Sequence, residues 1–90
     1  PMNLDEVDFT WTSNPRTTEV MPVEHLFRPP TALALQNEVQ AMATCLLTQG
    51  LSVRATEEGG YWQIVITGDD PTNDEVLIGL CAGWLTDYKQ

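Results

Sequence analysis

Residues 51–67 read LSVRATEEGGYWQIVIT, and this stretch predicts a β-hairpin. Gly59 and Gly60 separate two runs of alternating apolar and polar residues, and glycine tolerates the positive φ angles that tight hairpin turns require. With these glycines as the loop, Glu58 faces Tyr61 and six apolar side chains share one face. They are Leu51, Val53, Ala55, Trp62, Ile64 and Ile66. A shift of one residue would mix apolar and polar side chains, so the register is predicted as well.

The residues before the hairpin, 31–49, predict a helix. Pro29 and Pro30 block its extension upstream, and Thr31 is the expected N-terminal cap. Apolar residues then recur at helical spacing, and Gly50 stands where a helix end favours a left-handed residue.

A second helix is expected over residues 72–88, with Thr72 and Glu75 forming a capping box. Gly79 and Gly83 each destabilise a helix interior by roughly 1 kcal/mol relative to alanine. Either the sheet or a partner should therefore need that bare backbone. The expected apolar stripe of this helix consists of Leu77, Leu80, Cys81, Trp84, Leu85 and Tyr88.

The N-terminal third predicts a strand over residues 7–11, where apolar and polar side chains alternate. After a turn at 13–16, residues 17–21 are expected to return as a second strand, with Val20 opposite Phe9. Pro22 should end that strand, and residues 23–27 should form a single helical turn that carries His25 as a packing or surface residue.

The resulting order is ββαββα, an α+β fold with an antiparallel sheet of about four strands and two helices on one face. Pro1 precedes Met2 and is expected to be a cloning remnant, which leaves a single domain over residues 2–90.

Composition excludes several function classes. The 90 residues include 13 acidic and only 4 basic side chains, a formal net charge of -9, which argues against direct binding to nucleic acid or an anionic membrane. No apolar run is long enough to span a membrane, and no secretory signal is visible. Cys45 and Cys81 are expected to be buried reduced thiols in a cytoplasmic protein, with a disulfide as the alternative.

No catalytic, cofactor or metal site is expected. His25 is the only histidine, and no nucleophile or phosphate-loop motif accompanies it. The carboxylates at 69, 70, 74 and 75 lack the spacing of a calcium loop and suit the start of a helix.

The expected function is therefore that of a small, acidic, non-catalytic protein-binding module. An inhibitor or accessory regulator, such as those of phages and plasmids, fits this size and charge. The expected partner-binding residues lie on the sheet face away from the helices, where two copies of the chain are another expected pairing. They are Tyr61, Gln63, Val65 and Thr67.

Two alternatives stay open. One is a DNA mimic that binds a partner with a basic surface through a continuous acidic patch. That patch would comprise Asp5, Glu6, Asp8, Asp69, Asp70, Asp74 and Glu75. The other is a small enzyme, or an enzyme subunit, that uses the carboxylate cluster or His25.

Overall fold

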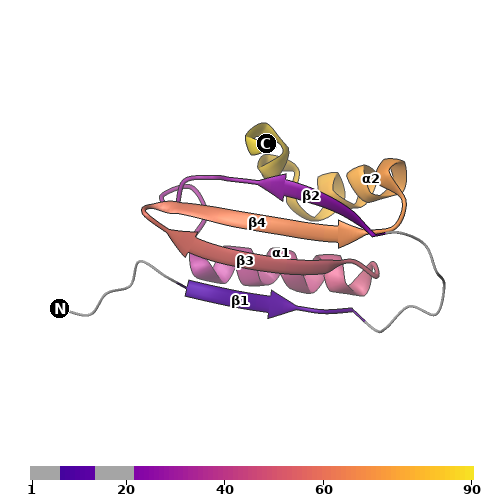
Figure 1. Cartoon of the computed structure of the whole chain (residues 1–90), viewed down its shortest axis with the longest axis horizontal. Helices are drawn as coiled ribbons and strands as arrows, with labels where there is room; N and C mark the ends of the chain where they lie inside the picture. The colour runs from indigo at the N-terminus through magenta and orange to yellow at the C-terminus, as the bar shows by residue number, and fades with distance from the viewer. Residues whose placement is uncertain (1–6, 14–21) are drawn as a thin grey trace.

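A computed structural model describes residues 7–13 and 22–90, which form a four-stranded antiparallel sheet in the order β1-β3-β4-β2 (Figure 1). The strands are β1 (Val7–Trp11), β2 (Val23–Phe27), β3 (Ser52–Glu58) and β4 (Tyr61–Gly68). The helices are α1 (Gln36–Thr48), α2 (Pro71–Ala82) and the 3-10 helix η1 (Gly83–Tyr88). The predicted α+β fold and its ββαββα order are confirmed.

The central hairpin has the predicted register. Gly59 and Gly60 have φ angles of 63° and 86°, the left-handed backbone of a tight two-residue turn. Glu58 pairs with Tyr61, and Val53 pairs with Ile66. The six apolar side chains assigned to one face are all buried there.

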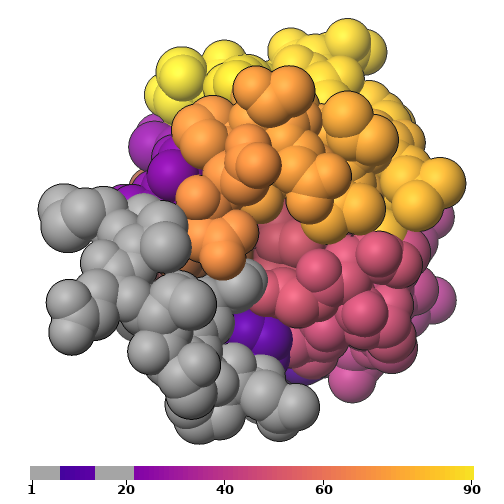
Figure 2. Space-filling model, turned by 90° about the vertical axis from the view of Figure 1, so that its right-hand side faces the viewer, coloured from indigo at the N-terminus to yellow at the C-terminus, as the bar shows by residue number. Residues whose placement is uncertain are grey.

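The helices form one layer on that apolar face of the sheet. α1 packs against β3 and β1, whereas η1 contacts β2. Leu46 of α1, Ile64 of β4 and Leu85 of η1 belong to one buried cluster. Figure 2 shows α2 stacked against the C-terminal end of α1.

The second strand among the described residues differs from the prediction for that segment. Residues 23–27 were expected to form a helical turn, but they form β2, which pairs antiparallel with β4. Their inward side chains follow a period of two, and both His25 and Phe27 are buried. The expected turn at 13–16 and strand at 17–21 lie largely outside the described residues.

The start of α1 also differs from the prediction. Residues 31–34 form a turn, and the helix begins at Gln36, where the Glu38 carboxylate accepts a hydrogen bond from the Leu35 N–H. Thr31 is not the cap, because its hydroxyl donates to the buried Glu57 carboxylate instead. The predicted helix end is confirmed, since Gly50 has a φ of 89°.

α2 begins and ends earlier than predicted. Asp70, not Thr72, caps it by accepting a hydrogen bond from the Asn73 N–H, and Pro71 occupies the first turn. At Ala82 the backbone leaves the helical region and continues as η1.

We expect Val53→Asp to reduce the free energy of unfolding by more than about 3 kcal/mol, because it places an unpaired charge in the core. Gln63→Asp, on the exposed face of the same hairpin, should change it by less than about 1 kcal/mol. Urea denaturation of the two variants measures the difference, and equal destabilisation would contradict the register.

Candidate functional site

The four predicted partner-binding residues all lie on the sheet face that no described helix covers, here called the helix-free face. Tyr61 is 46% exposed and Gln63 is also exposed. Thr67 is half-buried, and Val65 is only 9% exposed because it pairs with Arg54 on one side and Leu26 on the other. The structure therefore brings the four residues onto one strand but leaves little apolar surface among them.

The helix-free face is mainly polar. Its cross-strand rows are rich in threonine and charged side chains, and the guanidinium of Arg28 lies over the Tyr61 ring at 5.2 Å from the centroid. Two hollows on this face have volumes of about 100 and 160 Å³. Both are smaller than the roughly 300 Å³ at which ligand pockets begin. This face resembles the solvated side of an ordinary antiparallel sheet.

The acidic residues do not gather into one patch among the described residues. Asp8 lies on β1 opposite Thr56, whereas Asp69 and Asp70 follow the far end of β4. Asp74 is 2% exposed and so contributes nothing to the surface. Asp5 and Glu6 lie outside the described residues.

His25 joins the sheet to α2 through a buried pair with Asp74. The Nε2 atom of His25 lies 3.0 Å from Oδ2 of Asp74, and Nδ1 lies 3.8 Å from Oε2 of Glu75. Lys89 donates a hydrogen bond to the Glu75 carboxylate and so lowers the pKa of Glu75. His25 is 5% exposed. A substrate has little access to this imidazole, and the pair acts as a tether between β2 and α2.

Exposed apolar side chains lie mostly on the helix side of the domain. Leu80 is 70% exposed and Val76, one helical turn earlier in α2, is 64% exposed. Leu33 and Trp84 are 44% and 37% exposed. We call these four side chains the helix-side residues.

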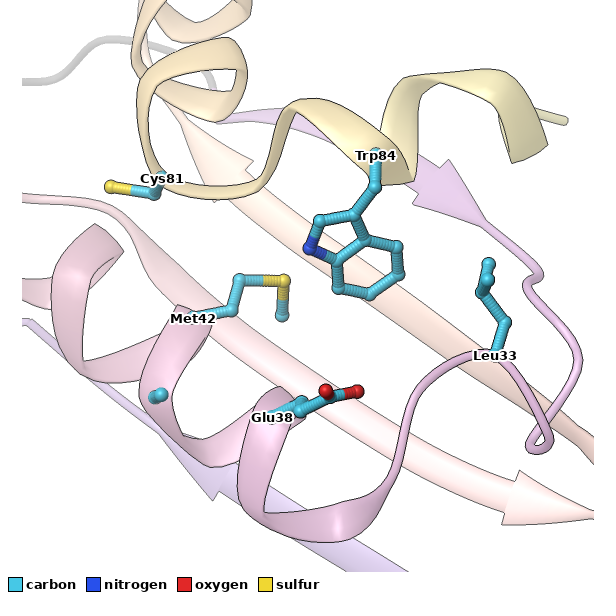
Figure 3. Close-up of a pocket in the computed structure, with 6 residues that line it drawn as sticks. Leu33, Glu38, Met42, Cys81 and Trp84 are labelled. Carbon is cyan, nitrogen blue, oxygen red and sulfur yellow. The ribbon is translucent and has the colours of Figure 1, made fainter.

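An open groove of about 440 Å³ lies between α1 and the start of η1 (Figure 3). Trp84 points into it from above, Met42 and Glu38 face it from α1, and Leu33 closes one end. Ala41 and Cys81 complete the lining. The walls are themselves partly exposed, so an occupant would lie along the surface.

Sequence reasoning placed Leu80 and Trp84 in the core stripe and missed this surface. The inward residues of the segment are Ile78, Ala82 and Leu85, together with Asp74. The two glycines held the relevant signal, since a Cβ added at Gly79 or Gly83 would meet no atom within 4 Å. The sheet does not require their bare backbone.

Cys45 of α1 and Cys81 of α2 form a disulfide, with their Cα atoms 5.7 Å apart. The expectation of two reduced thiols is wrong, because helix packing brings residues 36 positions apart in sequence onto facing sides of α1 and α2. The bond fixes one wall of the groove against the other.

Comparisons with protein families, curated proteins and solved structures found no match. Over residues 7–13 and 22–90, no group of three or more His, Cys, Asp or Glu side chains is arranged to hold a metal ion. In the same residues, no helix combines the length and apolar character needed to cross a membrane.

Replacing both cysteines with alanine should lower the free energy of unfolding by roughly 2–4 kcal/mol, as expected for a disulfide that closes a loop of this length. Alkylation of the unreduced protein in denaturant, followed by mass spectrometry, should label neither cysteine. Labelling of both would show that the disulfide is absent.

A second stability prediction concerns Gly68, where an added Cβ would overlap the carboxylate of Asp74. We expect Gly68→Ala to destabilise the protein by about 1–3 kcal/mol. The matched variant Gly79→Ala meets no neighbour and should stabilise α2 by up to about 1 kcal/mol. Thermal denaturation compares the two, and similar melting temperatures would argue against the tether.

Proposed function

We propose that this protein is a non-catalytic binding module that acts on another protein, as an inhibitor or accessory regulator, through its helix side. The observation that carries the proposal is the position of the exposed apolar side chains. Of the seven large hydrophobic side chains that are exposed among the described residues, four are the helix-side residues and a fifth, Leu35, immediately precedes α1, whereas Leu26 and Tyr61 alone lie on the helix-free face. Apolar anchors that become desolvated on binding supply most of the affinity of protein interfaces.

The form of α2 supports the same surface. Its outward side presents Val76, Gly79 and Leu80, so a partner can approach the helix backbone closely. A helix with apolar side chains on both its inner and outer sides is typical of one that is covered twice, by its own core and by a partner.

The disulfide indicates the kind of cellular compartment in which the protein would act. The Cys45–Cys81 bond favours an oxidising compartment over the cytoplasm that the sequence suggested, because disulfides persist where thiol reductants are scarce.

The DNA-mimic alternative has weaker support. Glu57 and Asp74 are buried and form hydrogen bonds, and Glu75 is paired with Lys89, so these carboxylates stabilise the fold. An enzyme that uses His25 would need the imidazole to become accessible, although Asp74 and the sheet enclose it.

The test compares the same substitution on opposite faces. Wild type, Leu80→Ser and Leu26→Ser are immobilised, partners are captured from the source cells, and the affinity of each variant for the identified partner is measured with purified proteins. We expect Leu80→Ser to lower that affinity by at least about tenfold, and Leu26→Ser to change it little.

The outcomes separate the competing functions. Loss of affinity with Leu26→Ser or Tyr61→Ser alone would move the site to the helix-free face. A steep fall of affinity with added salt, together with loss on charge reversal at Asp69 and Asp70, would favour the DNA mimic.

A further inference from the structure

The groove between α1 and η1 has the form of a seat for a single large apolar side chain. Met42 at its floor is 3% exposed, whereas Trp84 and Leu33 at its walls keep 37% and 44% of their surface. A small molecule bound there would stay largely in water, which is unlike most ligand sites. A side chain carried on a longer segment would cover the walls as well.

The charge around the groove indicates which charge a bound segment should carry. The segments that form the helix layer, 36–48 and 71–88, contain no lysine or arginine; of their four carboxylates, Asp74 is buried and Glu75 is paired with Lys89, which leaves Glu38 and Asp87. Glu38 lines the groove itself, and Asp87 lies on η1. In contrast, Arg28 and Arg54 both lie on the helix-free face. An occupant with positive charge beside its apolar anchor therefore complements the groove.

A second copy of the chain is a poor occupant for the same reason. Two grooves placed face to face would bring the Glu38 carboxylates of both copies together, and Lys89, which follows η1, already pairs with Glu75. Like charges that meet at an interface destabilise the complex.

We propose that this groove binds a basic amphipathic helix of the partner protein, with one apolar side chain seated between Trp84 and Met42 and a lysine or arginine beside Glu38. This inference rests on the proposed function and names the chemistry of its partner. It follows the common mode in which an amphipathic helix lays its apolar face into a groove.

The probe is a synthetic helical peptide of about 16 residues, long enough to form a helix, with leucine and tryptophan on one face and lysine on the others. A second peptide replaces every lysine with glutamate. Both are titrated into the isotopically labelled protein with its disulfide intact, and amide chemical shifts are recorded. We expect the lysine peptide to shift amides of residues 33–42 and 81–85, and the glutamate peptide to shift none.

Matched variants separate seating in the groove from general attraction to an acidic protein. Ala41→Phe fills the groove and should lower the affinity for the lysine peptide by about tenfold or more. Gln40→Phe, at an exposed position on the same helix, should leave that affinity unchanged. Glu38→Gln keeps a side-chain oxygen that can accept the hydrogen bond from the Leu35 N–H, but it removes the charge. It should lower the affinity for the lysine peptide by about two- to fivefold at low salt. Glu24→Gln, on the helix-free face, should have a smaller effect.

The proposal is overturned if Ala41→Phe binds the lysine peptide as wild type does, or if the shifts spread over the helix-free face. Equal binding of the glutamate peptide, or dimerisation of the chain through the groove, would also overturn it. If Leu80→Ser still abolishes capture of the cellular partner while Ala41→Phe does not, the binding function stands and this occupant is wrong.

Discussion

The left-handed backbone at Gly59 and Gly60 sets the register of β3 against β4, and the other elements are placed relative to that hairpin. β1 pairs with β3 and β2 pairs with β4, so a slip of one residue in the hairpin would turn apolar side chains away from the helices. The turn also anchors the connection into α1, because the Gly60 carbonyl accepts a hydrogen bond from the Thr31 N–H. Core, helix layer and groove therefore depend on two residues that no side chain can replace without strain.

The sequence predicted what local signals determine. Turn chemistry and alternation both lie within the hairpin, so its residues were assigned correctly. β2 was missed because the apolar residues of 23–27 fit both the spacing of a helical turn and the alternation of a strand. The strand interpretation also requires a polar residue, His25, to point into the core. The partner that makes this placement favourable is Asp74, 49 residues away. A buried hydrogen bond between distant elements leaves no trace in either local pattern.

The exposed apolar surface on the helix side was missed for a related reason. An apolar arc that covers most of a helix does not say which side faces inward, and α2 buries Ile78 while Leu80 is exposed. The inward direction is set by the pairing of Asp74 with His25 and by the disulfide to α1. Both are tertiary contacts. Only the unfavourable glycines of this helix hinted that its outer side has a use, since helix stability alone would replace them with alanine.

The acidic and basic side chains are distributed unequally between the helix side and the helix-free face. An exposed apolar surface on a small protein favours self-association, and carboxylates around it oppose that process between identical copies. The same carboxylates accelerate encounter with a cationic partner. Because residues 36–48 and 71–88 lack arginine and lysine, while Arg28 and Arg54 lie on the opposite face, the proposed function gives the charge the role of discriminating between partners at the place where apolar side chains would supply affinity. Under the proposed function, acidity and exposed apolar surface are two parts of one mode of binding, in which the first limits the choice of partner and the second stabilises the complex.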